Sequence, residues 1–100
     1  MSEQGTRIRP ADHPEPVVLY VTHYCGYCMM AKALLDRLDV PYRSIDVTTD
    51  PAARAELVER TGRRTVPQIF IHGRSIGGYQ ELHELHARGA LAAMVASAAS

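Results

Sequence analysis

Two cysteines, Cys25 and Cys28, constrain this chain more than any other feature. They are the only cysteines in 100 residues, and they stand three apart in the sequence C-G-Y-C. A hydrophobic run over residues 17–21 precedes them, and a helical pattern over residues 29–38 follows. The pair therefore lies where a buried strand gives way to a helix. With strand and helix on either side, this spacing indicates a redox-active dithiol.

The position of the pair suits this chemistry. A thiolate is the nucleophile in disulfide exchange, and the free N–H groups and dipole at a helix N-terminus stabilise an anion. Cys25 lies just ahead of the predicted helix, where its sulfur can be exposed. Cys28 falls in the first turn, close enough to attack a mixed disulfide on Cys25. We therefore predict Cys25 as the nucleophile and Cys28 as the resolving thiol.

Three other roles fit the cysteine pair less well. A zinc site could use His23 as a third ligand, but structural zinc usually needs four N or S ligands. The sequence has no second C-x-x-C and no H-x-x-x-H. A structural disulfide across so short a loop would remove little chain entropy. Two inert core cysteines are the third alternative.

Length and charge describe one ordinary soluble domain, because 100 residues suffice for a modest core. The 11 basic and 11 acidic residues cancel, so no net charge favours nucleic acid or an anionic membrane. No apolar run approaches the roughly 20 residues of a membrane span. The polar N-terminus does not resemble a signal peptide. We expect a cytoplasmic protein with no nucleic-acid or membrane partner.

Hydrophobic periodicity and turn residues divide the chain into a tail and one domain. Residues 1–16 hold prolines and a glycine among charged residues, which predicts a flexible N-terminal extension. Residues 17–98 form the predicted domain, with strands at 17–21, 42–47, 68–71 and 74–76, and helices at 26–39, 51–61, 79–87 and about 90–99. The first helix is predicted to turn inward Tyr27, Ala31, Leu34, Leu35 and Leu38.

Local signals mark several of these boundaries. Asp50 before Pro51 predicts the start of the second helix, and Gly62 predicts its end. His72 and Gly73 fit a tight hairpin turn. The first strand, helix and strand imply a parallel pair joined by a right-handed crossover.

Three separated motifs then carry a family resemblance. They are C-G-Y-C at 25–28, T-V-P at 65–67 and G-G-Y-Q-E at 77–81. In this order and spacing, the chain resembles the dithiol type of the glutaredoxin family, in the thioredoxin-like superfamily, over residues 17 to 95. The resemblance implies an α/β fold in the order β-α-β-α-β-β-α, with a four-stranded mixed sheet flanked by helices.

The resemblance also implies a glutathione site. Pro67 would follow a cis peptide bond, and the backbone of Val66 would pair with the extended tripeptide. The N–H of Gln80 would receive the γ-glutamyl carboxylate and Glu81 would face the ammonium, while Arg64 would reach the glycine carboxylate. The implied glutathione-binding residues are Tyr27, Arg64, Thr65, Val66, Pro67, Gly78, Tyr79, Gln80 and Glu81. Without the motifs, Glu81 would be an acidic residue at a helix start and Arg64 a solvated loop charge.

The implied activity is glutathione-dependent reduction of protein–glutathione mixed disulfides and protein disulfides by a monomer. Cys25 would carry glutathione after attacking a mixed disulfide, and a second glutathione would release glutathione disulfide. With a protein disulfide, Cys28 would resolve the intermediate. Glutathione would be the co-substrate, and glutathionylated or disulfide-containing proteins would be the partners.

Two departures from the family pattern leave alternatives open. Gly26 stands where many members have proline, and some members without it bind a [2Fe-2S] cluster between two subunits. Cys25 of each subunit would then be a ligand in a homodimer that carries or senses iron–sulfur clusters. Thr22 replaces a common lysine, which removes one cation near the thiolate. Another alternative to the glutathione-dependent enzyme is an electron donor fed by thioredoxin reductase or by another low-molecular-weight thiol.

Overall fold

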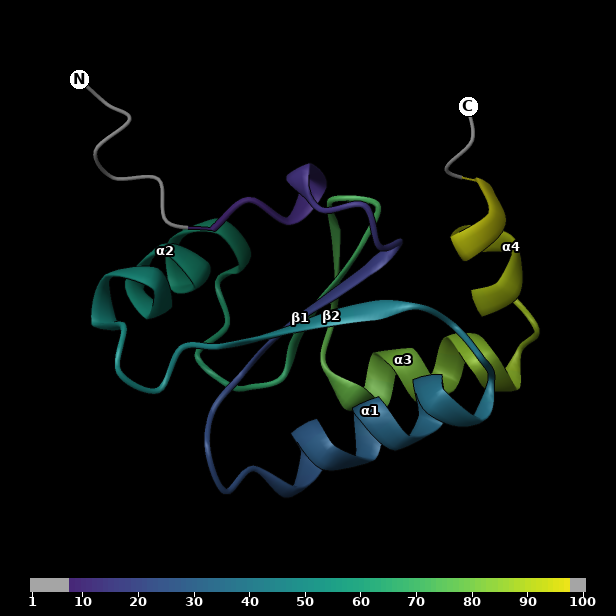
Figure 1. The fold of residues 1–100 in the computed structure, drawn as a ribbon, viewed down its shortest axis with the longest axis horizontal. Coiled ribbons are helices and arrows are strands. Elements are labelled where there is room, and N and C mark those ends of the chain that lie inside the picture. Colours follow the sequence, from purple (N-terminus) through teal and green to yellow (C-terminus); the bar gives the residue numbers. More distant parts are fainter. Residues whose placement is uncertain (1–7, 98–100) are drawn as a thin grey trace.

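The computed structural model describes residues 8–97, which form one four-stranded sheet with helices on both faces (Figure 1). Its elements are η2 (Pro10–Asp12), β1 (Val17–Val21), α1 (Gly26–Arg37), β2 (Tyr42–Asp46), α2 (Pro51–Thr61), β3 (Gln68–Ile71), β4 (Arg74–Gly77), α3 (Tyr79–Ala87) and α4 (Leu91–Ala96). The strand order is β2-β1-β3-β4, in which β1 runs parallel to β2 and antiparallel to β3. Strand β4 is antiparallel to β3. The predicted mixed sheet and element order are confirmed.

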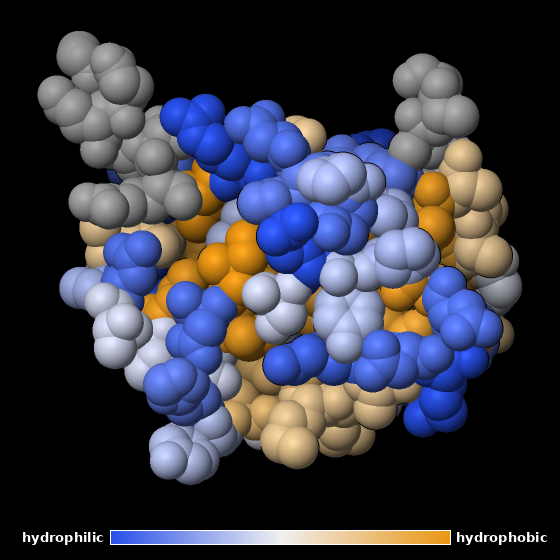
Figure 2. All heavy atoms as spheres, in the orientation of Figure 1, coloured by the Kyte–Doolittle hydropathy of each residue, from blue (hydrophilic) through white to orange (hydrophobic). Residues whose placement is uncertain are grey.

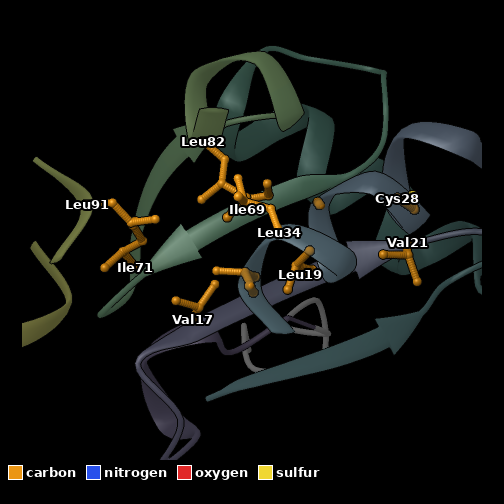
Figure 3. Close-up of a cluster of buried hydrophobic side chains, with 11 residues drawn as sticks. Val17, Leu19, Val21, Cys28, Leu34, Ile69, Ile71, Leu82 and Leu91 are labelled. Carbon is orange, nitrogen blue, oxygen red and sulfur yellow. The ribbon is translucent and has the colours of Figure 1, made fainter. Parts of the chain in front are cut away.

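Strand β1 is buried along its whole length because helices cover both faces of the sheet. Val17, Leu19 and Val21 project into the larger apolar cluster, which α1 and α3 close (Figure 3). Val18 and Tyr20 project the other way, into a smaller cluster beneath α2. A strand with two buried faces reads as a continuous hydrophobic run, which explains why this strand is the clearest one in the sequence.

The residues predicted to cap the second helix and to form the hairpin turn do so in the structure. The Asp50 carboxylate accepts a hydrogen bond of 3.1 Å from the N–H of Ala53, so it caps α2. Gly62 ends that helix with a φ of 75°. His72 and Gly73, with φ of 50° and 82°, form the turn between β3 and β4. These features are confirmed because each depends on only a few neighbouring residues.

Helix α1 differs from the prediction in two respects. It ends at Arg37 rather than Asp39, because Asp39 has a left-handed backbone with a φ of 56°. Tyr27 was expected on the inner face but is 62% exposed, and Cys28 is buried there instead. The Tyr27 ring stacks on Tyr79 of α3 rather than on the sheet. Exposed Met29 and Met30 add to the moderately hydrophobic surface along α1 (Figure 2).

Residues 8–16 differ from the expected flexible extension, while residues 1–7 lie outside the described part of the chain. Ile8 is only 1% exposed and packs in the cluster beneath α2. Its carbonyl accepts a hydrogen bond of 3.1 Å from Arg60, and Glu15 accepts two from Arg43. A single apolar residue among prolines and charges has no periodicity, so the sequence pattern did not reveal this packing.

Replacing Ile8 by alanine is therefore expected to lower the free energy of unfolding by about 2–3 kcal/mol, as for other buried aliphatic truncations. A residue in a solvated tail would change it by less than about 0.5 kcal/mol. Urea unfolding of Ile8→Ala beside the wild type measures the difference, with the exposed Ala11→Ser as a control. An unchanged midpoint in Ile8→Ala would show that this contact does not stabilise the domain.

Candidate active site

The two cysteines occupy the N-terminus of α1 as free thiols. Cys25 is the N-cap residue, and its half-buried Sγ accepts a hydrogen bond of 3.1 Å from the N–H of Cys28. Cys28 is 2% exposed and packs in the larger core cluster (Figure 3). The N–H of Cys28 can thus stabilise negative charge on Cys25, in agreement with the predicted role of Cys25 as nucleophile.

Burial, followed by the hydrogen bond and the charge of Cys25, raises the pKa of the Cys28 thiol to about 12. The Cys28 thiol is therefore protonated as long as Cys25 is not part of a disulfide. Once Cys25 enters a mixed disulfide, its charge disappears and one cause of the raised pKa is removed. The geometry accordingly favours attack by Cys25 first and by Cys28 second.

The loop before β3 faces the nucleophile. The peptide bond between Val66 and Pro67 is cis, as the resemblance implied. The carbonyl oxygen of Val66 lies 3.7 Å from Cys25 Sγ. The backbone of Val66 therefore lies directly beside the reactive sulfur, where it can pair with an extended ligand.

A groove of about 440 Å³ opens along this loop, and we call it the main groove. Its lining residues are Tyr27, Arg63, Thr65, Val66, Pro67, Gly78, Tyr79, Gln80 and Glu81. Every predicted glutathione-binding residue except Arg64 is in this set. Tyr27 and Tyr79 stack with ring centroids 6.1 Å apart, so they form one aromatic side of the groove.

The G-G-Y-Q-E motif forms a sharp turn into α3. Gly77 has a φ of 110°, and Gly78 is the N-cap residue of the helix. Glu81 reaches back so that its Oε1 accepts the N–H of Gly78 at 2.8 Å. The N–H of Gln80 lies in the first helical turn, where backbone donors have no acceptor within the helix. This end of the main groove is thus suited to an anion.

Arg63 is a groove residue that the sequence analysis did not assign. Its guanidinium forms a bidentate pair with Glu81, with N···O distances of 3.0 and 3.3 Å. The hydrogen bond from Arg63, followed by that from Gly78, lowers the pKa of Glu81 to about 2. Two adjacent arginines offer no sequence signal for which one faces the groove, because that depends on how the loop turns against α3.

Arg64 lies in a neighbouring hollow of about 180 Å³, which we call the side hollow. Its lining residues are Arg54, Ala55, Leu57, Val58, Arg63, Arg64, Thr65, Val66 and Gln68. Since Arg63, Thr65 and Val66 line both spaces, the side hollow adjoins the main groove at this loop. Three arginines and no acidic residue line the side hollow, so it also suits an anion.

His23 does not complete a metal site with the cysteines. Its Nε2 lies 3.0 Å from Asp46 Oδ2. Within residues 8–97, no group of three or more histidine, cysteine or acidic side chains is placed to hold a metal ion. The same part of the chain contains no helix with the length and hydropathy to span a membrane.

The sheet topology, the half-buried N-capping cysteine and the facing cis-proline loop define a dithiol protein of the thioredoxin-like class. The family model named Glutaredoxin matches residues 17–76. A glutaredoxin of Pseudomonas aeruginosa is 43% identical over 82 residues, which cover 82% of this chain and 98% of the relative. Glutaredoxin 3 of Escherichia coli K12 is 44% identical, over 75% of this chain and 90% of its own.

Solved structures show the same likeness. A buckwheat glutaredoxin–glutathione complex is 38% identical with a TM-score of 0.80, covering 85% of this chain and 80% of that one. The holo form of glutaredoxin C1 from Populus tremula x tremuloides is 35% identical with a TM-score of 0.83, covering 91% and 84%. The chain belongs to the glutaredoxin family of thiol–disulfide oxidoreductases.

Proposed function

We propose that this protein is a glutathione-dependent oxidoreductase that reduces protein–glutathione mixed disulfides and protein disulfides. The observation that carries the proposal is the placement of Cys25 Sγ 3.7 Å from the Val66 carbonyl, beside a groove suited to anions at both ends. Glutathione is an extended tripeptide with a carboxylate at each end and a sulfur between them. The buckwheat relative was solved in complex with glutathione, which supports the same use here.

In the proposed complex, the cysteinyl part of glutathione pairs with the backbone of Val66. The γ-glutamyl end lies at the start of α3, near the Gln80 N–H and Glu81. The glycine carboxylate lies in the side hollow, where Arg64 and Arg54 supply guanidinium groups. The charged ends then position the sulfur beside Cys25, which is how binding energy accelerates a bimolecular exchange.

The proposed reaction begins with attack by the Cys25 thiolate on the glutathione sulfur of a mixed disulfide. The protein leaves as a thiolate and takes up a proton, and Cys25 carries glutathione. A second glutathione thiolate then attacks that sulfur, which releases glutathione disulfide and restores Cys25. With a protein disulfide, the Cys25 thiolate attacks one protein sulfur, and the other leaves as a thiolate that takes up a proton. Cys28 then attacks the Cys25 sulfur of this mixed disulfide, transfers its proton to the departing protein thiolate and leaves a Cys25–Cys28 disulfide. Two glutathiones then reduce this disulfide.

The first experiment is a turnover assay on protein purified without air, with its visible spectrum recorded beforehand. We expect a colourless monomer that reduces a glutathionylated peptide with glutathione. A brown dimer that turns over only after losing its colour would instead assign a [2Fe-2S] role to Cys25. A colourless protein inactive with glutathione would overturn the proposal and direct attention to thioredoxin reductase or another thiol. We also propose the cytoplasm as its compartment, which fractionation of cells would test.

Replacing Arg64 by alanine is expected to raise the KM for glutathione about three- to tenfold, with little change in kcat. The reason is that a charge-assisted contact to the glycine carboxylate binds the ground state and the transition state alike. Arg37→Ala, which removes an exposed guanidinium at the end of α1, is the matched control. An unchanged KM in Arg64→Ala would remove this residue from the site.

A further inference from the structure

The bidentate pair of Arg63 and Glu81 places a positive and a negative charge side by side. These charges are complementary to the carboxylate and the ammonium of an amino-acid zwitterion. We propose that Arg63 is a specificity-determining residue that binds the α-carboxylate of a γ-glutamyl thiol while Glu81 faces its ammonium. The inference rests on the proposed use of glutathione and adds a residue and a selection rule to it.

The pair is built into the wall of the main groove. Arg63 lies at the loop before the cis proline and Glu81 lies in the first turn of α3, so their contact joins the two sides of the groove. The backbone of Arg63 is anchored, because its carbonyl accepts a hydrogen bond of 2.9 Å from the buried amide of Gln68. Glu81 is anchored by the Gly78 N–H. The main chain of Arg63 and the carboxylate of Glu81 are therefore each held by a hydrogen bond, and the guanidinium of Arg63 is held by Glu81.

The pair retains hydrogen-bonding capacity for a ligand. A guanidinium has five N–H donors, and Glu81 accepts two of those on Arg63. A carboxylate has about four acceptor positions, and three of those on Glu81 are taken by Arg63 and Gly78. Three donors and about one acceptor thus remain, which matches a carboxylate and an ammonium carried on one carbon.

The charges of the pair also explain why Glu81 alone would select poorly. A lone carboxylate attracts the α-ammonium of the ligand but repels the α-carboxylate beside it. The guanidinium of Arg63 cancels this repulsion and offers a planar fork to the carboxylate. Because the pKa of Glu81 is lowered to about 2, the pair keeps both charges at physiological pH. We therefore expect preference for thiols with a free α-amino-acid end over thiols that lack one.

The test compares two mixed disulfides of the same peptide. One carries glutathione, and the other carries an analogue whose γ-glutamyl α-carboxylate is an amide. The wild type should prefer glutathione in kcat/KM, and Arg63→Gln should lower this preference about fivefold because it removes a charge-assisted fork. Arg63→Lys should recover part of the preference, since lysine keeps the charge but not the fork. Arg88→Gln removes an exposed arginine at the other end of α3 and should keep the wild-type ratio.

Two outcomes would overturn the inference, and they differ from failure of the proposed function. If Arg63→Gln reduces activity toward both substrates by the same factor, Arg63 only supports the groove and does not read the carboxylate. If the wild type shows no preference between the substrates, the zwitterion is not recognised. A wild type that is inactive with glutathione itself would instead overturn the glutathione proposal.

Discussion

Replacing Cys25 by serine is expected to reduce turnover of a glutathionylated peptide by at least about a thousandfold, as for loss of a catalytic nucleophile. Cys25 is the half-buried sulfur beside the main groove, and it receives the Cys28 N–H at 3.1 Å. A serine hydroxyl in its place would remain protonated and could not form a disulfide. The turnover assay with glutathione measures the loss, and retention of more than a few per cent of activity would contradict the assignment.

Cys28→Ser is the matched control, because it makes the same replacement of sulfur by oxygen at the other cysteine. It should retain turnover of the glutathionylated peptide, since glutathione itself releases the intermediate on Cys25. With a protein disulfide, the same variant should stall as a mixed disulfide that mass spectrometry detects. Equal loss of both activities in Cys28→Ser would show that Cys28 does more than resolve the intermediate.

Gly77→Ala is expected to reduce both stability and the affinity for glutathione. Gly77 has a φ of 110°, which costs a residue with a Cβ roughly 1–3 kcal/mol. A Cβ would also lie 2.6 Å from Arg63 Nη1 and 2.8 Å from Glu81 Cδ, so the ion pair would have to move. We expect urea unfolding to show the loss of stability and the KM for glutathione to rise about tenfold, because two charged contacts are displaced together.

Gly89→Ala separates backbone strain from the clash. Gly89 also has a positive φ, of 75°, but a Cβ there would meet nothing within 4 Å. This variant should lose about 1 kcal/mol of stability and keep the wild-type KM. If Gly77→Ala also keeps that KM, displacement of Arg63 and Glu81 does not matter to glutathione binding.

Most of the fold could be predicted because its signals are local or periodic. The continuous apolar run of residues 17–21 indicated a strand buried on both faces, and the Asp50 and Gly62 boundaries follow from capping by near neighbours. The packing of Ile8 could not be predicted in this way. It depends on contact with the cluster beneath α2, whose members come from distant parts of the chain.

The candidate site shows the same division. C-G-Y-C, T-V-P and G-G-Y-Q-E are short motifs, and the cis bond before Pro67 that the family resemblance implied is present in the structure. Which arginine faces the main groove was not encoded locally, because Arg63 and Arg64 are neighbours of one type in one loop. Contact with Glu81, eighteen residues later, distinguishes Arg63.

The sequence by itself determined the dithiol, its place at a helix start and the order of strands and helices, because these depend on residue type and spacing along a few turns of chain. Only the tertiary structure decided that Cys28 is buried with a raised pKa, that Ile8 belongs to the core and that Arg63 pairs with Glu81. Burial and ion pairing depend on which distant segments the sheet brings together, and no local pattern specifies that.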